Sequence, residues 1–96
     1  MKHNQRITEI IDATAQFFGL PKKVMMSKCR YPEIAIPRMT AMYLAHEEGF
    51  TYSGIARRFN RHHGTVLHAV KSRRNDEQTN LKAALEIQKV RELIKS

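Results

Sequence analysis

The 96-residue sequence has few of the features that mark secreted or membrane-spanning proteins. It contains a single cysteine, Cys29, so no disulfide can form within the chain. The first ten residues, MKHNQRITEI, lack the apolar stretch of a secretory signal peptide. No apolar run approaches the roughly 20 residues that are needed to cross a bilayer. These absences exclude a membrane span and favour a cytoplasmic protein.

Acidic residues are also few. Nine Asp and Glu stand against 17 Lys and Arg, which leaves a formal net charge of +8. Such an excess in a small domain indicates a polyanionic partner, either nucleic acid or a membrane surface. The basic residues are scattered between helices and loops and do not line one face of a long amphipathic helix. We therefore expect nucleic acid, with no membrane partner.

No segment of the sequence is typical of catalytic machinery. Its five histidines come without a nucleophile motif or paired carboxylates in a shared site. His46-Glu47-Glu48 is not the H-E-x-x-H metal motif, and His63 and His68 are five residues apart, a poor pitch for chelation on a helix. No G-x-x-x-x-G-K-[ST] segment is present to hold nucleotide phosphates. We expect no enzyme activity, metal, cofactor or small-molecule substrate.

Three prolines and four glycines are few enough to act as punctuation between helical patterns. Apolar residues with i, i+3, i+4, i+7 spacing stop at Gly19, which predicts a first helix over residues 5–18. Residues 22–28 could form a short second helix. Two prolines in CRYPEIAIP disfavour regular helix there, which predicts a basic loop over residues 28–36.

Helical patterns continue through the second half of the chain. Pro37 suits the first position of a helix and Gly49 the position after its end, so a central helix is predicted over residues 37–48. Two shorter helices joined by a tight turn follow over residues 51–74, as in a helix-turn-helix. A last helix over 79–95 carries a broad apolar stripe, widened by leucines, that could pack on the core or on a second copy. Nothing alternates with a period of two, so we predict one all-α domain, a compact bundle of five to six helices.

A helix-turn-helix places the first turn of its second helix in the major groove, where side chains must read bases or bind phosphates. The basic and polar residues of that region are Arg61, His62, His63, Thr65, His68, Lys71, Arg73 and Arg74. For His63 and His68 the alternative is that they are ordinary surface histidines. Leu67 could contact a thymine methyl group or belong to the core, and the spacing leaves both open.

Two segments of the sequence carry a family resemblance. Residues 36–45, I-P-R-M-T-A-M-Y-L-A, resemble R-P-R-x-x-A-M-x-L-A, and residues 61–69, R-H-H-G-T-V-L-H-A, resemble R-D-H-T-T-V-L-H-A. Both patterns are features of the C-terminal DNA-binding domain of the DnaA family of bacterial replication initiators, and the resemblance covers nearly the whole chain. It implies sequence-specific binding of double-stranded DNA at a DnaA-box-like site, an A·T-rich half followed by a CACA-like half. A role in replication initiation or its regulation is implied with it.

The resemblance also implies roles for individual residues. Arg30 matches a loop arginine that enters the minor groove, as expected where an A·T-rich groove is narrow. Arg38 matches a phosphate-contacting arginine. His63 matches a histidine that reads bases from the major groove, and Leu67 a leucine that packs on thymine methyl groups. Two residues match partners on the phosphate side: Thr65 and His68.

The sequence departs from the family pattern at four positions. His62 replaces an aspartate, which predicts the loss of a helix cap and of an acceptor for base amino groups. Gly64 replaces a threonine, which predicts looser reading of the groove, unless the glycine lets the backbone approach the DNA more closely. Ile36 and Met39 replace an arginine and a glutamine, which predicts fewer contacts with the DNA backbone. We expect a site preference shifted from the family's box.

Full-length members of the family carry an AAA+ nucleotide-binding domain ahead of the DNA-binding domain. Because the sequence begins with Met1 and a coherent first helix, we expect a free-standing protein that regulates or marks initiator sites. The rival hypothesis is a protein-interaction or transcription-regulatory module without preference for the box, docking a partner through its last helix. DNA binding predicts that one set of cations converges on one face: Lys28, Arg30, Arg38, Arg61, Lys71, Arg73 and Arg74.

Overall fold

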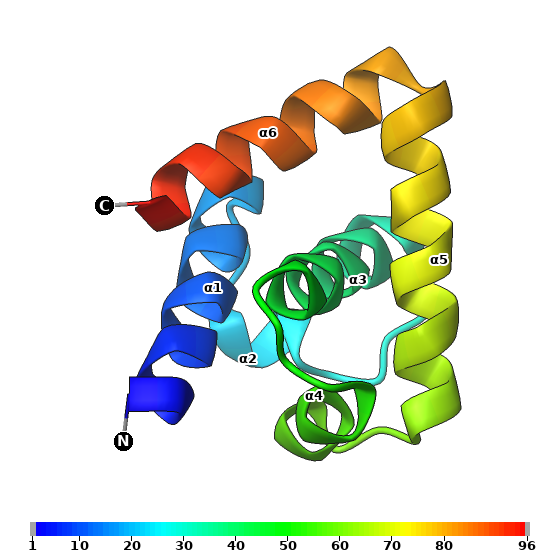
Figure 1. Cartoon of the computed structure of the whole chain (residues 1–96). Coiled ribbons are helices and arrows are strands. Elements are labelled where there is room, and N and C mark those ends of the chain that lie inside the picture. Colours follow the sequence, from blue (N-terminus) through cyan, green and yellow to red (C-terminus); the bar gives the residue numbers. More distant parts are fainter. Residues whose placement is uncertain (1, 96) are drawn as a thin grey trace.

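Six helices make up residues 2–95, the part of the chain that this computed structural model describes, and no strand occurs in that range. The helices are α1 (Lys2–Phe18), α2 (Lys22–Met25), α3 (Pro32–Glu47), α4 (Tyr52–Phe59), α5 (His63–Thr79) and α6 (Leu81–Lys95). Figure 1 shows α3 in the centre, with α1 on one side, α5 on the other and α6 crossing above them. The predicted all-α bundle with a helix-turn-helix is confirmed.

The centre of the fold is α3, whose second half is apolar on nearly every side. Residues 40–45 are all buried, and Ala41 and Ala45 expose no surface. Such small side chains let neighbouring helices approach closely, and α3 packs most extensively against α5 and α1. Ile10 and Ile11 of α1 are equally buried, and burying each contributes about 1.5–3 kcal/mol. The core therefore forms around α3.

The basic loop predicted over residues 28–36 is wrong in its second half, because α3 begins at Pro32 and contains Pro37. Pro32 occupies the first helical position, where a backbone N–H would have no helical partner in any case. Pro37 deprives the helix of only one backbone hydrogen bond, to the carbonyl of Glu33, and its ring is buried with the core. The loop between α2 and α3 is therefore shorter, residues 26–31.

The corner between the last two helices also lies beyond its predicted place. α5 continues past residue 74 to Thr79, and α6 begins at Leu81. Asn80 separates them with an extended backbone, φ −134°, and its Oδ1 accepts a hydrogen bond from the N–H of Ala83 at 3.0 Å. This is the N-cap arrangement that satisfies a helix start. The extension of α5 has no apolar periodicity to predict it.

An ion-pair cluster holds the end of α5 and the middle of α6 against α3. Arg91 donates from Nε and Nη2 to the two carboxylate oxygens of Glu47, each at 3.0 Å, and from Nη1 to Glu77 Oε2 at 3.0 Å. The Tyr43 hydroxyl donates to Glu77 Oε1 at 2.6 Å. Arg91 holds the pKa of Glu77 below its ordinary value, while burial and the bond to Glu77 raise the pKa of Tyr43 to about 12. One arginine therefore links three helices.

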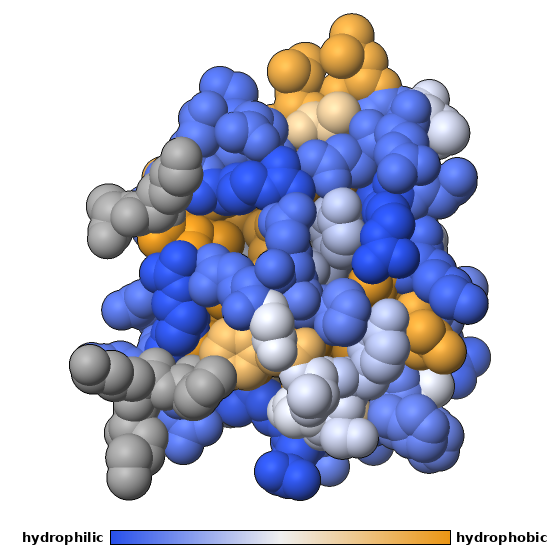
Figure 2. Space-filling model, in the orientation of Figure 1, coloured by the Kyte–Doolittle hydropathy of each residue, from blue (hydrophilic) through white to orange (hydrophobic). Residues whose placement is uncertain are grey.

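Only one side of α6 belongs to the core. Its buried residues are Ala83, Ile87, Val90 and Ile94. Leu81 and Leu85 are 75% and 55% exposed, so of the two alternatives predicted for the broad stripe they do not follow packing on the core of this chain. Figure 2 shows apolar surface near the corner where α5 meets α6. None of the described helices is long and apolar enough to cross a bilayer.

Candidate nucleic-acid interface

The helix-turn-helix consists of α4, a turn at residues 60–62 and α5. Thr51 caps α4 by accepting a hydrogen bond from the N–H of Gly54 at 3.0 Å, as its place in the sequence predicts. Asn60 then reverses the chain in the left-handed region, φ 54°, which asparagine tolerates better than most residues. The N–H of Arg61 bonds to the carbonyl of Ala56 at 2.8 Å and closes the turn. A tight turn of this kind holds the start of α5 at a defined angle to α4.

α5 presents two different faces. Its inner face is buried and consists of Val66, Ala69, Val70 and Arg73. Its outer face carries four exposed residues of the predicted site: His63, Thr65, His68 and Lys71. Leu67 lies between the two faces and is half-buried, which is compatible with both of the roles that its spacing leaves open.

The predicted loss of a cap at His62 is wrong. His62 is the N-cap residue of α5, and its Nδ1 accepts a hydrogen bond from the N–H of Gly64 at 3.0 Å. A neutral imidazole has a lone pair on one ring nitrogen, and that lone pair serves here as a carboxylate oxygen would. The imidazole proton then lies on Nε2. His62 also stacks on His63, with ring centroids 4.4 Å apart.

Gly64 is matched to this cap. A methyl group on Gly64 would lie 3.1 Å from Nδ1 of His62, closer than an ordinary van der Waals contact. A larger residue at position 64 would therefore press on the imidazole and weaken its bond to the backbone. The two departures from the family pattern, His62 and Gly64, are thus physically coupled.

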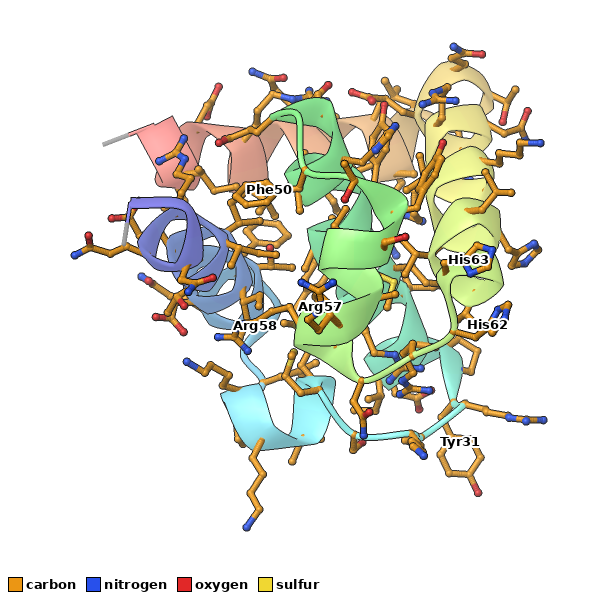
Figure 3. All side chains as sticks on the ribbon, turned by 60° about the horizontal axis from the view of Figure 1, so that its bottom comes forward. Tyr31, Phe50, Arg57, Arg58, His62 and His63 are labelled. Atoms are coloured by element: carbon orange, nitrogen blue, oxygen red, sulfur yellow. The ribbon has the colours of Figure 1, made fainter. Side chains whose placement is uncertain are left out.

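The loop of residues 26–31 forms the second part of the candidate interface. Lys28 and Arg30 are exposed, and neither makes a hydrogen bond or ion pair with another described residue. Tyr31, which is not among the residues predicted from the sequence, is 71% exposed. Figure 3 shows Tyr31 on the same side of the molecule as His62 and His63. An aromatic residue inside a basic loop is the signal that could have identified it.

Arg38 does not lie on the surface where a phosphate contact requires it. Arg38 is only 7% exposed, and its guanidinium donates hydrogen bonds to the carbonyl oxygens of Ser27 at 2.7 Å and Cys29 at 2.8 Å. Burial, together with the nearby Arg61, lowers the pKa of Arg38. The apolar residues that follow it on α3 are the sequence signal of this burial. Arg38 holds the loop in place from inside.

Arg61 holds the same loop from the other side. Its Nη2 donates to the carbonyl oxygen of Ser27, which also accepts from Arg38. Because Arg61 immediately precedes the start of α5, this bond ties the loop to the helix-turn-helix turn. The two parts of the candidate interface are therefore joined through one carbonyl group.

Arg73 also turns inward and leaves the predicted basic track. Its side chain is 4% exposed and pairs with Asp76 at 3.1 Å. Of the cations predicted to converge, four are exposed: Lys28, Arg30, Lys71 and Arg74. The other three are directed into the protein: Arg38, Arg61 and Arg73. Across the described part of the chain, no group of three or more His, Cys, Asp or Glu side chains could hold a metal ion.

Two helices joined by a tight turn, with polar residues and cations on the exposed side of the second helix, define a helix-turn-helix domain of the DNA-binding class. A family profile described as the bacterial dnaA protein helix-turn-helix matches residues 7–72. The chain belongs to this family. The match is to a DNA-binding module, so these 96 residues do not form an enzyme.

Relatives named chromosomal replication initiator protein DnaA are similar to the chain. The protein of Wolbachia pipientis wMel is 39% identical over 93 residues, which cover 93% of this chain and 20% of the relative. The protein of Sphingopyxis alaskensis is 44% identical over 68 residues, 69% of this chain and 15% of the relative. The protein of Caulobacter vibrioides is 40% identical over 67 residues, which cover 68% of this chain and 14% of the relative. The chain thus spans a fifth or less of the length of these relatives.

Proposed function

We propose that the chain binds double-stranded DNA sequence-specifically at a DnaA-box-like site and acts in replication initiation or its regulation, in the cytoplasm. The observation that carries the proposal is the shared Ser27 carbonyl, which holds an exposed basic loop at a set position relative to the start of α5. Reading two adjacent grooves at once requires two elements at a set spacing. The family to which the chain belongs supports the same function.

In the major groove, α5 would read bases through the exposed residues of its first two turns. His63 is the base-reading residue in this proposal, with Leu67 against thymine methyl groups. Thr65, His68 and Lys71 would contact phosphates, which position the helix without carrying sequence information. His62 adds a difference from the family. Because its Nδ1 accepts from the backbone, its Nε2–H is a donor, which favours a base acceptor at that position.

In the minor groove, Arg30 would enter from the loop. It is exposed and makes no hydrogen bond or ion pair with another described residue, so its guanidinium is available. A narrow A·T-rich groove has enhanced negative potential and attracts arginine. Arg38 and Arg61 then act as positioning residues for Arg30 rather than as phosphate contacts.

The rival hypothesis of a protein-interaction module has one observation in its favour. Leu81 and Leu85 expose apolar surface on α6, away from the core residues of the same helix. A partner protein on α6 would be compatible with DNA binding at the start of α5. A protein partner on α6 does not by itself account for the exposed basic loop.

Selection of bound duplexes from a random pool tests the proposed function. We expect a DnaA-box-like sequence with an A·T-rich half, altered at the positions facing His62 and Gly64. The His63→Ala variant should lose discrimination between sites, worth about 1–3 kcal/mol, more than it loses non-specific affinity. Recovery of random sequences by the parent protein would overturn sequence-specific binding.

A further inference from the structure

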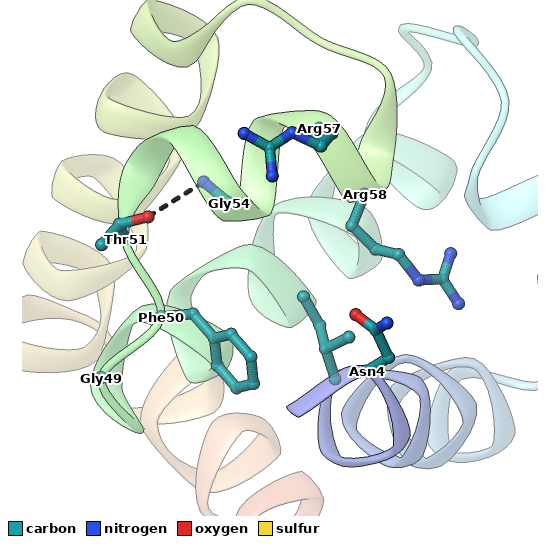
Figure 4. Close-up of a pocket in the computed structure, with 8 residues that line it drawn as sticks. Asn4, Gly49, Phe50, Thr51, Gly54, Arg57 and Arg58 are labelled. Carbon is teal, nitrogen blue, oxygen red and sulfur yellow. Dashed lines mark hydrogen bonds between the residues drawn. The ribbon is translucent and has the colours of Figure 1, made fainter. Parts of the chain in front are cut away.

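A pocket of about 460 Å³ lies between α4, the first turns of α1 and the turn that joins α3 to α4. Ile7 and Phe50 contribute its apolar side, and Asn4, Arg57 and Arg58 contribute polar groups. Figure 4 shows Arg57 and Arg58 extending from α4 in different directions, Arg57 past Gly54 and Arg58 toward Asn4, with Phe50 below them. The candidate DNA interface does not use any of these residues.

The charge of the pocket is uncompensated. None of the described residues that line it is acidic. The side chain of Arg57 is exposed and makes no hydrogen bond or ion pair with another described residue. The guanidinium of Arg58 donates to the hydroxyl of Thr8 at 3.1 Å, its one hydrogen bond within the described part of the chain. The acidic residue beside the pocket in sequence, Glu48, is held by Arg6 through bonds of 2.6 and 2.8 Å. Two guanidinium groups are therefore left to attract an anion.

We infer that this pocket docks a segment of a partner protein in which an acidic side chain lies next to an aromatic or aliphatic one. Guanidinium groups bind carboxylates through charge-assisted hydrogen bonds, often two at a time. The half-buried Phe50, which lies beside the buried Ile7 in the lining, provides a surface for the neighbouring apolar side chain. A concave site that joins these two chemistries matches an acidic peptide better than it matches a duplex, whose backbone offers no apolar group to insert.

The location of the pocket permits DNA and this partner to bind together. Figure 3 shows Arg58 between α4 and α1, whereas His62 and His63 lie across α4, at the start of α5. An occupant of the pocket would contact α4 from the side opposite to α5. The site therefore serves to bring an acidic protein to a DNA-bound domain.

A display library of random heptapeptides, selected on the chain with duplex DNA bound, tests this inference. Duplex covers the candidate DNA interface, so acidic peptides cannot be selected by it. We expect enrichment of peptides with Asp or Glu next to Phe, Leu or Ile. In the ¹⁵N spectrum, a selected peptide should shift the amide signals of Gly49 and Gly54, which line the pocket. Selected peptides without this pattern, or shifts confined to other helices, would overturn the proposal.

Variants complete the test. Arg57→Gln should weaken a selected peptide about tenfold, the effect of losing a hydrogen bond to a charged group. Asn4→Asp places a negative charge at the pocket in the first turn of α1, where an acidic residue favours the helix, so binding should fall without loss of fold. Lys89→Gln removes one exposed charge from α6 and should change nothing. If Arg57→Gln instead weakens duplex binding as much as Lys71→Gln does and leaves peptide binding intact, Arg57 is a DNA contact and the inference is wrong.

Discussion

Arg38 and Arg61, 23 residues apart in the sequence, both donate hydrogen bonds to the carbonyl oxygen of Ser27. Two like charges are brought together around one acceptor, and the burial of Arg38 lowers its pKa. Hydrogen bonds to charged donors are worth more than neutral ones, which offsets part of this cost. The arrangement fixes the loop of residues 26–31 to the turn that precedes α5.

Arg38→Met should weaken duplex binding without changing its dependence on salt. Removing the loop bonds is expected to destabilise the fold by about 1–3 kcal/mol and to loosen Arg30. Because no phosphate contact is lost, the slope of log K against log salt should stay at roughly −4, the value for about four cations. Titrations at several salt concentrations measure this slope. Lys71→Gln is the control, and its slope should be shallower by about 1; the same change in Arg38→Met would make Arg38 a phosphate contact.

The coupling of His62 and Gly64 should be measurable as a double-mutant cycle. In the His62→Ala background, Gly64→Ala should stabilise the domain by up to about 1 kcal/mol, the difference in helix propensity. With His62 present, the new methyl group presses on the capping imidazole and should cancel about half of that gain or more. Urea unfolding of the four proteins gives the coupling. Equal effects of Gly64→Ala in both backgrounds would show that the cap and the glycine are independent.

The looser reading predicted for Gly64 implies that Gly64→Thr should tighten binding, and the coupling to His62 reverses that expectation. A threonine alone should displace His62 from its cap and should not tighten binding of a DnaA-box-like duplex. His62→Asp combined with Gly64→Thr restores an acceptor that can cap α5 beside a β-branched residue. Only this double variant should move the selected site toward the box of the family. Tighter binding by Gly64→Thr alone would contradict this account.

The Glu77 cluster should make stability sensitive to acid. Arg91 lowers the pKa of Glu77 in the folded state, so the ionised carboxylate stabilises the fold above the ordinary glutamate range. That contribution is lost as the pH falls through the lowered value, below 4.5. Glu77→Gln should therefore cost about 1–2 kcal/mol at pH 7 and progressively less in acid. Urea unfolding between pH 7 and 3 tests this. The control is Glu92→Gln, at an exposed position on α6, which should change the free energy of unfolding little at any pH. If Glu77→Gln lowers the free energy of unfolding equally at every pH, the ionised pair is not the cause.

Arg30→Ala should weaken binding most where the flanking minor groove is narrow. The enhanced negative potential of A·T tracts adds to the attraction of an inserted arginine, and a G·C-rich flank provides less of it. Affinities for duplexes that differ only in this flank measure the effect, with Lys71→Gln as the variant expected to weaken both equally. An equal loss for both flanks with Arg30→Ala would place Arg30 on a phosphate.

The helical fold could be predicted because it depends on local pattern. Periodic apolar residues mark α1 and α6, and Thr51 and Gly49 mark helix ends, since caps and periodicity act within a few residues. The start of α3 could not be predicted, because a proline inside a helix is disfavoured locally and is tolerated only when the core buries it, as it does Pro37. The length of α5 has the same origin: Glu77 is held by Arg91, a partner from another helix.

The sequence by itself determined the class of the protein: an all-α domain with a helix-turn-helix, a strong positive charge and the two segments of its family. Only the tertiary structure decided which basic residues are exposed and which are held inside by hydrogen bonds. Arg30 and Arg38 are both arginines near one loop, yet the first is exposed and the second is buried under loop carbonyls. His62 and Gly64 look like two separate losses until the imidazole is seen to cap α5 in the space that the glycine leaves. Composition and spacing report which groups are present, whereas burial and hydrogen-bond partners depend on packing between segments distant in the sequence.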